Sequence, residues 1–251
     1  MELGLKGRVA VVTGGAAGIG LAIARTLANE GCCVWIADLD GIQAERTASA
    51  LSTGSAVHAV ALDVSSQAQV DAAVQTIVQA EGRLDILVCN AGILKSGPFL
   101  ESTTSDWEAV ASVNLTGVMN CIRAAVKPML RHGYGRIVNV ASISAMRGGG
   151  SIGNVLYGTS KAGVVALTLG LAREFGPYNI TVNAVAPAVA DTPMTRATLS
   201  DEVTERIVSR IPLGRLAMPS DIADAVAFLA SDRAGFVTGA IVPIDGGLLT
   251  T

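Results

Sequence analysis

The chain has 251 residues, of which half are apolar and 16% are charged, and its formal net charge is −3 from 18 basic and 21 acidic residues. This composition supplies ample apolar material for a buried core and excludes a chain that is disordered throughout. The sequence holds no cluster of Lys and Arg that could neutralise a run of phosphates, so no nucleic-acid partner is expected.

Neither a secretory leader nor a membrane span is expected. The chain reaches the glycine-rich segment Thr13-Gly14-Gly15 too early for a basic stretch followed by an apolar signal core. The strongest apolar stretch, residues 162–172, has about 11 residues and falls well short of the roughly 20 that cross a bilayer. We therefore expect a soluble, cytoplasmic protein without membrane contact.

The cysteines and histidines show no pattern typical of a metal site. Cys32, Cys33, Cys89 and Cys121 form no CxxC pair and have no histidine nearby at metal-ligand spacing. We predict reduced core thiols and no bound metal, since free cysteine is commonly buried. His58 and His132 are expected at the surface and receive no function.

Short runs rich in β-branched residues alternate along the chain with longer segments of helical spacing. Strands are predicted, in chain order, at 8–13, 33–37, 56–62, 84–89, 135–141, 180–184 and 240–244. Apolar residues recur at helical intervals between them, as in Ile19-Ala22-Ile23-Leu27. Repeated strand and helix units require a parallel sheet covered on both faces, so we predict a doubly wound α/β fold with seven parallel strands.

The chain is predicted to be a single domain, 1–251, because no linker, composition shift or repeat divides it. Its one long irregular segment, 188–215, follows the sixth predicted strand and carries Pro193 and Pro212. Ligands of open α/β sheets sit beyond the carboxyl ends of the strands, so this segment is predicted to cover a substrate. The alternative is a surface insertion without function.

A glycine-rich turn joins the first predicted strand to the first helix, Thr13-Gly14-Gly15-Ala16-Ala17-Gly18-Ile19-Gly20. Such a turn lets the main chain approach a pyrophosphate and directs helix N–H groups at it. Asp38 ends the second predicted strand, where a carboxylate can accept hydrogen bonds from adenosine ribose hydroxyls. It would repel a 2′-phosphate, and neither the turn nor Leu39 offers a neutralising Lys or Arg, so we predict NAD rather than NADP.

A tyrosine and a lysine lie four residues apart at the start of a predicted helix, in Tyr157-Gly158-Thr159-Ser160-Lys161. This interval places both side chains on one helix face. A free phenol has a pKa near 10, and a nearby ammonium group lowers the pKa by favouring the phenolate. The pair is therefore predicted to transfer a proton to or from an alcohol.

Together these motifs resemble the short-chain dehydrogenase/reductase family. Glycines at 14, 18 and 20 match its TGxxxGxG turn, and the resemblance extends through Asn90-Ala91-Gly92 and Tyr157/Lys161 to Asp245-Gly246-Gly247. It implies a Rossmann-type fold and a set of NAD contacts comprising Gly14, Gly18, Ile19, Gly20, Asp38, Leu39, Asp63, Val64, Asn90, Ala91, Gly92, Tyr157, Lys161, Pro187, Val189 and Thr192. The family usually has Pro-Gly where this chain has Pro187-Ala188, and Cys89 replaces a common Asn.

The resemblance also implies four catalytic residues. Tyr157 would be the general acid/base, and Lys161 would lower its pKa and bind the nicotinamide ribose. Asn114 would hold a water in a proton relay, and a serine after the fifth strand would bind the substrate oxygen. Ser142 follows from the end of the strand and is preferred, whereas counting back from Tyr157 gives Ser144 as a rival.

The resemblance predicts an NAD(H)-dependent oxidoreductase for a secondary alcohol or ketone of the polyol, diol or cyclic class. The predicted walls of the substrate site are 93–100, 144–156 and 189–213. An NADPH-dependent 3-oxoacyl thioester reductase of the same fold is the alternative, and a non-catalytic NAD-binding regulator is a more distant one. The helix 157–175 is apolar nearly all round, which together with the resemblance predicts a homotetramer, or else a dimer.

Overall fold

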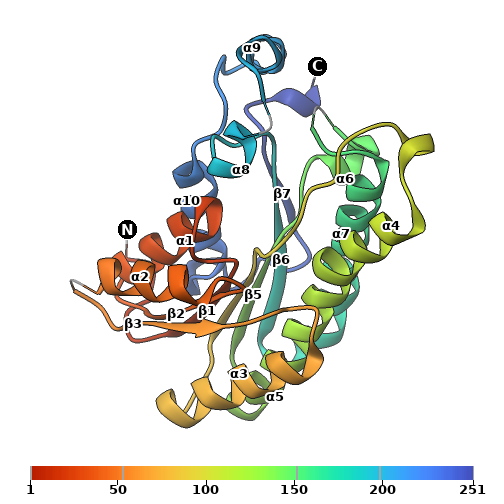
Figure 1. The fold of residues 1–251 in the computed structure, drawn as a ribbon. Coiled ribbons are helices and arrows are strands. Elements are labelled where there is room, and N and C mark those ends of the chain that lie inside the picture. The colour runs from red at the N-terminus through yellow and green to blue at the C-terminus, as the bar shows by residue number, and fades with distance from the viewer. Residues whose placement is uncertain (1, 53, 151, 198, 251) are drawn as a thin grey trace.

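The computed structural model describes residues 2–52, 54–150, 152–197 and 199–250, and in these ranges the chain forms a parallel sheet between two layers of helices (Figure 1). The strands are β1 (Val9–Thr13), β2 (Cys33–Asp38), β3 (Val57–Ala61), β4 (Ile86–Cys89), β5 (Gly135–Val140), β6 (Ile180–Pro187) and β7 (Ile241–Ile244). They lie in the order β3-β2-β1-β4-β5-β6-β7, and every neighbouring pair is parallel. The predicted seven-stranded, doubly wound sheet is confirmed.

The central strands are buried on both faces. Every residue of β1, β4, β5 and β6 is buried, which explains why these strands are mostly apolar and show no regular alternation of apolar and polar residues. The strand β6 extends to Pro187, three residues beyond the predicted 180–184, and so carries the main chain up to the edge where ligands bind.

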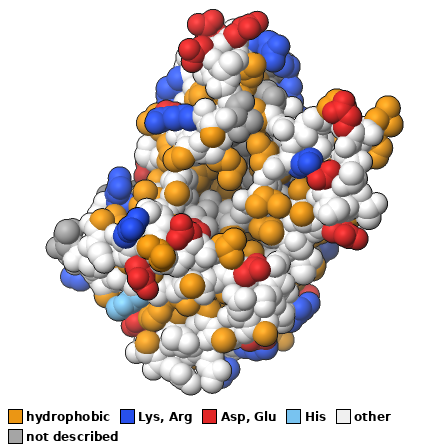
Figure 2. Space-filling model, viewed as in Figure 1, with side chains coloured by type: hydrophobic (Ala, Val, Ile, Leu, Met, Phe, Trp, Pro, Cys, Tyr) orange, Lys and Arg blue, Asp and Glu red, His pale blue; other side chains and the backbone are white. Residues whose placement is uncertain are grey.

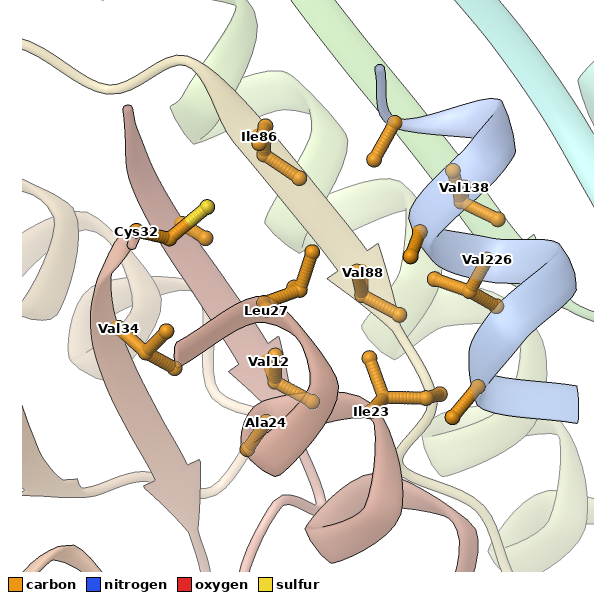
Figure 3. Packing of buried hydrophobic residues seen from close by; sticks show 14 of the residues in the cluster. Val12, Ile23, Ala24, Leu27, Cys32, Val34, Ile86, Val88, Val138 and Val226 are labelled. Carbon is orange, nitrogen blue, oxygen red and sulfur yellow. The ribbon is translucent and has the colours of Figure 1, made fainter. Parts of the chain in front are cut away.

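One face of the sheet is covered by α1 (Gly18–Asn29), α2 (Gly41–Leu51) and α10 (Pro219–Leu229). Ile23 and Leu27 of α1 face Val226 of α10 and the strand side chains below, such as Val12 and Val88 (Figure 3). All of these side chains are completely or almost completely buried. Each contributes on the order of 1.5–3 kcal/mol relative to an exposed position, so this layer fixes the start of α1 against the sheet.

The other face is covered by α3 (Gln67–Glu81), α5 (Gly117–His132) and α7 (Val155–Phe175), which pack on strand residues such as Val11, Leu87 and Ile137. The helix α4 (Thr104–Ala111) runs into α5 through a π-helical turn, Ser112–Thr116. Short 3-10 turns lie at Phe99–Glu101, Gly176–Tyr178, Asp232–Ala234 and Leu248–Thr250.

Three short helices lie beyond the carboxyl ends of the strands: α6 (Ser144–Arg147), α8 (Pro193–Arg196) and α9 (Asp201–Val208). They surround a separate apolar cluster formed by Ile143, Val189, Ile207, Ile211 and Leu248. The predicted segment 188–215 is therefore a pair of short helices with connecting turns. Residue 198 of this segment, residue 151 of a predicted substrate wall, and residues 1 and 251 of the predicted domain lie outside the described residues.

Two helical stretches of the described chain, Thr104–His132 and Val155–Tyr178, are long and apolar enough to cross a membrane by length and composition alone. The sequence estimate missed this because it considered only residues 162–172. Both stretches include a helix that packs on a face of the sheet, as core helices of a globular fold do. Only 39% of the most apolar window in Val155–Tyr178 is buried within the chain, so much of its outer side is uncovered.

Candidate active site

A cavity of about 480 Å³ opens beyond the carboxyl ends of the central strands. It is bounded by α1 and α8 on one side and by α6 and α7 on the other, and Figure 2 shows the hollow with hydrophobic side chains around it. Its volume lies within the range of about 300–1,000 Å³ typical of small-molecule and cofactor sites.

The glycine-rich turn forms the floor of one end of this cavity. Gly14 and Gly18 line it with φ angles of 63° and 55°, a left-handed conformation that disfavours other residues. Gly20 does not line the cavity, unlike Gly14 and Gly18. A Cβ at Gly20 would collide with the carbonyl oxygen of Gly14, so this glycine lets the helix pack against the turn.

The first turn of α1 is suited to bind an anion. Ala17 occupies the N-cap position and supplies no side-chain acceptor to the helix amides, and the first turn holds no acidic residue. Gly18 and Ile19 line the cavity at this point. The positive end of the helix dipole and its N–H groups therefore face the space where the predicted pyrophosphate would lie.

Thr13 connects the turn to β4, a role that the sequence analysis missed. Its hydroxyl accepts the N–H groups of Asn90 and Ala91 at 3.0 and 3.1 Å and donates to the carbonyl of Val88. The Asn90 amide in turn donates to the carbonyls of Thr13 and Gly14. Asn90, Ala91 and Gly92 line the cavity from the strand side, and the threonine preceding Gly14 was the available sequence signal.

Asp38 lies at the end of β2, on the cavity wall. One carboxylate oxygen accepts the N–H of Ala16 at 3.0 Å and the other accepts the N–H of Asp40 at 3.1 Å. Each oxygen retains a lone pair for a further donor, as recognition of ribose hydroxyls requires. Leu39, Asp63 and Val64 line the same end, and Leu39 is largely exposed.

The catalytic end of the cavity is built on the first turns of α7. Asn154 caps this helix, and its side-chain oxygen accepts the N–H groups of Leu156 and Tyr157. Tyr157 and Lys161, one turn apart, both line the cavity. Asn154 belongs to a predicted substrate wall, but its oxygen is used to start the helix that carries Tyr157.

Ser142 rather than Ser144 lies close enough to the phenol to act on it, and its hydroxyl lowers the pKa of Tyr157. The hydroxyl of Ser142 also accepts the N–H of Ser144 at 3.1 Å, which orients it toward the cavity. Ser144 begins α6, and its hydroxyl points toward Gly150, where an added Cβ would lie 2.9 Å from it. Both serines line the cavity, but only Ser142 acts on the phenol of Tyr157.

Lys161 is a buried ammonium group under the catalytic end. Its Nζ donates to the carbonyl of Val140 at 2.8 Å, and only 4% of the residue is exposed. Burial lowers its pKa from 10.5 to about 8, partly offset by the neighbouring Cys89. With a pKa of about 8, Lys161 is still mostly protonated at neutral pH and donates hydrogen bonds as an ammonium group.

That Lys161 lowers the pKa of Tyr157 stays a prediction, because burial of the phenol is the dominant influence in the chain alone. Its Nζ lies 5.8 Å from the centre of the phenol ring, and burial raises the pKa of Tyr157 above 10. The hydroxyl of Ser142 acts in the opposite direction but does not outweigh burial. Desolvation of the charged phenolate therefore dominates, and a further positive charge above the ring is needed to favour the phenolate.

Asn114 lies on the π-helical turn between α4 and α5 and is completely buried. Its amide donates to the carbonyl of Ile93 and to the hydroxyl of Ser160, and its oxygen accepts the N–H of Ile93. The Ser160 hydroxyl donates to the carbonyl of Tyr157, so Asn114 is joined to the first turn of α7. Widened π turns are frequent at functional sites.

Comparison with known proteins now identifies this arrangement. Residues 14–249 match a protein-family model described as "Enoyl-(Acyl carrier protein) reductase". The chain belongs to the short-chain dehydrogenase/reductase family. It is an oxidoreductase of this family, which uses a nicotinamide cofactor.

Relatives match over almost their whole length. The chain is 39% identical to "3-oxoacyl-[acyl-carrier-protein] reductase FabG" of Aquifex aeolicus, with 99% of this chain and 100% of the relative covered. It is 44% identical to "Cis-4-hydroxycyclohexanecarboxylate dehydrogenase" of Sinomonas cyclohexanicum, with 96% of each covered. The solved structure of gox2181 is similar with a TM-score of 0.97 and 38% identity over 100% of this chain and 98% of that chain.

The residues of this short-chain dehydrogenase/reductase fit a nicotinamide dinucleotide. The turn from Gly14 to Gly20 and the amino end of α1 suit its pyrophosphate, and Asp38 suits its adenosine ribose. Lys161 suits its second ribose. Pro187, Val189 and Thr192 line the cavity between these ends. Ala188 stands where the family usually has Gly. Its N–H donates to the carbonyl of Ile244 at 3.0 Å, so the main chain at this position is held against β7.

The remaining wall of the cavity is mostly apolar. It is formed by Ile93, Leu94, Ile143, Ile152, Val189, Met194 and Leu248. Only parts of the predicted substrate walls reach it, and Leu248 near the carboxyl end of the chain was not predicted. Arg147 is the one cation besides Lys161 among the described residues that line the cavity.

Proposed function

We propose that this enzyme transfers a hydride between NAD(H) and a secondary alcohol or ketone, of the polyol, diol or cyclic class. The observation that carries the proposal is the placement of Tyr157, Ser142 and Lys161 at one end of a cavity whose other end holds Asp38. Lys161 lies beside the phenol without forming a competing ion pair with a carboxylate in the described structure.

The proposed reaction begins with the substrate hydroxyl held between Ser142 and Tyr157. Ser142 donates to or accepts from the substrate oxygen and fixes its position. Tyr157 in its phenolate form then takes the hydroxyl proton as general base, and it returns the proton as general acid during reduction. A bound nicotinamide supplies the hydride acceptor, and its positive charge in the oxidised form favours the phenolate.

The direction of the pH dependence follows from the raised pKa of Tyr157. Only the phenolate accepts the alcohol proton, so alcohol oxidation accelerates as the pH rises toward the tyrosine pKa. Ketone reduction needs the protonated phenol and has its optimum at lower pH. The two directions measured on one substrate pair therefore have pH profiles displaced from one another.

The preference for NAD is supported by the charge at the adenosine end. The Asp38 carboxylate stands on the cavity wall, and no Lys or Arg among the described residues lines this end. A 2′-phosphate would meet an unneutralised carboxylate there, which disfavours NADP.

The cyclic class is the best supported of the three substrate classes. The apolar wall suits a saturated ring better than a polyol, whose hydroxyl groups would be left without partners. The relative named cis-4-hydroxycyclohexanecarboxylate dehydrogenase supports this choice, and Arg147 offers a cation for a ring-bound carboxylate. A hydroxylated cyclohexane carboxylate is therefore the first substrate to assay.

An NADPH-dependent 3-oxoacyl thioester reductase is the second candidate. Relatives named 3-oxoacyl-[acyl-carrier-protein] reductase favour it, although they share fewer residues with this chain than the cyclohexane relative does. Asp38 argues against the coenzyme of this candidate, so coenzyme choice and substrate together discriminate between the two.

The test is a panel assay on the purified enzyme. Cyclic secondary alcohols, diols and polyols are offered with NAD⁺ and NADP⁺, and acetoacetyl thioesters with NADH and NADPH, while the absorbance of the reduced coenzyme is followed. We expect the highest kcat/KM for a cyclic alcohol with NAD⁺. Higher efficiency for a thioester with NADPH would replace this proposal by the second candidate.

We also propose that the enzyme is a cytoplasmic homotetramer, with a dimer as the smaller alternative. The partly uncovered outer side of α7, where Leu169 is exposed, and the edge strand β7 support further burial between copies. Light scattering coupled to gel filtration gives the mass directly, and a monomer would contradict this assembly.

A further inference from the structure

We propose that Cys33, His58 and Glu81 form a binding site for a divalent transition-metal ion of the Zn²⁺ type. The three residues come from different elements: Cys33 begins β2, His58 is the second residue of β3, and Glu81 ends α3. Their ligand atoms, one thiol sulfur, one imidazole nitrogen and one carboxylate oxygen, all lie within 4.8 Å of one another.

The separations approach those of a tetrahedral site. Zinc bonds of about 2.0–2.3 Å imply that neighbouring ligand atoms lie roughly 3.3–3.8 Å apart. The His58 Nε2 and Glu81 Oε1 atoms are already 3.7 Å apart. Closing the remaining distance to the Cys33 sulfur requires a movement of about 1 Å, which side-chain rotation supplies.

Trp35 holds two of the ligands in place. Its indole N–H donates to Glu81 Oε1 at 3.2 Å, and its ring stacks on the His58 imidazole with the centroids 4.8 Å apart. Trp35 is itself buried and lies beside His58 in the parallel register of β2 and β3. Metal-ligating carboxylates and imidazoles are commonly oriented by such neighbours, which are held by the fold rather than by the metal.

The local charge favours a cation. The Glu81 carboxylate lies within 4.8 Å of the Cys33 thiol and of the His58 imidazole and gives the cluster its negative charge. A bound divalent ion takes the thiolate form of Cys33 as its ligand, and the thiol proton is released to solvent. His58 is 44% exposed, which leaves a path for the ion and room for a water as fourth ligand.

The ligand types select the kind of ion. Thiolate and imidazole are preferred by Zn²⁺ over Mg²⁺ and Ca²⁺, which prefer oxygen ligands. Three protein ligands leave an open position on the metal, unlike the four of a closed structural site. The site lies at the amino ends of the parallel strands, whereas the active-site cavity lies at their carboxyl ends, so the two are separate.

A bound ion would stabilise the edge of the sheet by linking three elements of the fold. The strand β3 is an edge strand, and the site joins it to β2 and to the end of α3. An ion that binds only the folded chain raises the free energy of unfolding by RT ln(1 + c/Kd), where c is the concentration of the free ion. The expected role is therefore stabilisation of this edge rather than catalysis.

Cobalt(II) titration of the reduced, metal-free full-length enzyme tests the site. We expect saturable binding of one ion per chain, visible as a thiolate-to-cobalt charge-transfer band, and displacement by Zn²⁺. Cys33→Ser should abolish the charge-transfer band, and His58→Ala or Glu81→Gln should weaken binding by more than the roughly tenfold to hundredfold effect of losing an orienting neighbour. Trp35→Phe should weaken it within that range.

The matched control is His132→Ala, which removes the other histidine of the chain at an exposed position near the end of α5. It should bind cobalt like the unaltered enzyme, and circular dichroism should show that all variants are folded. Absence of the charge-transfer band in the unaltered enzyme overturns the proposal. Binding that survives both Cys33→Ser and His58→Ala also overturns it, because the ion would then lie elsewhere.

Discussion

The two ends of the active-site cavity are built in different ways. At the coenzyme end, Asp38, Asn90 and the turn from Gly14 to Gly20 are tied to the main chain by short hydrogen bonds and by positive φ angles. At the substrate end, Arg147 and Met194 are exposed side chains on the short helices α6 and α8. A rigid frame therefore fixes the reacting ring, while the surface that selects the substrate is free to differ between relatives.

The largest effect is expected from Tyr157→Phe, at the boundary between the coenzyme end and the substrate end of the cavity. Loss of the proton-transferring hydroxyl should lower kcat/KM by about a hundredfold to ten-thousandfold. Coenzyme affinity, measured by NADH fluorescence titration, should change little because the frame is intact. Tyr178→Phe alters a tyrosine that is 54% exposed and serves as the control. Near-normal turnover of Tyr157→Phe would exclude the proposed role.

The serine pair gives the next largest effect. Ser142→Ala removes the hydroxyl that lowers the pKa of Tyr157 and should lower kcat by about a hundredfold to a thousandfold, as loss of one transition-state donor does. Ser144→Ala, measured by the same steady-state assay, should keep kcat near the original value. The reverse pattern would assign the catalytic role to Ser144.

Burial of Lys161 should be visible in the stability of the coenzyme-free enzyme. Because its pKa falls from 10.5 to about 8 on folding, the unfolded chain binds the proton more strongly between these pH values. The free energy of unfolding should therefore rise with pH across this window, by about 3 kcal/mol at 1.36 kcal/mol per unit.

Lys161→Met should lack this rise, whereas Lys127→Met, at a side chain that is 61% exposed, should keep it. Urea unfolding of all three proteins between pH 7 and pH 10 measures the difference. The same pH slope in Lys161→Met and the unaltered enzyme would show that the lysine is solvated rather than desolvated.

Asp38→Asn should change coenzyme choice by a smaller amount. Losing a charged acceptor should lower kcat/KM for NAD⁺ by roughly tenfold to a hundredfold, and removing the repulsion should raise it for NADP⁺. Kinetics with both coenzymes measure the ratio. Asp40→Asn, at the exposed N-cap of α2, should leave the ratio unchanged. An unchanged ratio in Asp38→Asn would mean that another group selects the coenzyme.

The smallest effect is expected at the substrate end, from Arg147→Gln. An exposed cation contributes about 0.2–1 kcal/mol, so KM for a carboxylate-bearing cyclic alcohol should rise by at most about fivefold. KM for the neutral cyclic alcohol should not change. Arg131→Gln, exposed on α5, is the control. Equal effects on the charged and neutral substrates would show that Arg147 acts on packing rather than on charge.

Much of the coenzyme end could be predicted from the sequence because local patterns determine it. Gly14, Gly18 and Asp38 are recognisable from their spacing after two β-branched runs, and the structure places all three on the cavity wall. The helical interval between Tyr157 and Lys161 likewise needed no tertiary information. Gly20 was assigned to the same set, but its position against Gly14 depends on how the helix packs.

Other features depend on contacts between distant segments and could not be read from the sequence. The raised pKa of Tyr157 results from the depth of burial, which the charge pattern alone does not reveal. The cluster of Cys33, His58 and Glu81 exists because Trp35 of β2 pairs with His58 of β3 and because α3 ends above them. Spacing along the chain gives no sign of this register.

The hydrogen bond from the Ala16 N–H to Asp38 has a consequence for redesign of coenzyme specificity. The carboxylate that would discriminate between the two coenzymes also supports the loop on which either coenzyme would rest. Shortening this side chain to admit a phosphate would leave a main-chain donor without its acceptor and would loosen the loop at the same time. A successful exchange should therefore pair the removal of the acid with a new acceptor for that amide, such as a serine or threonine hydroxyl placed nearby.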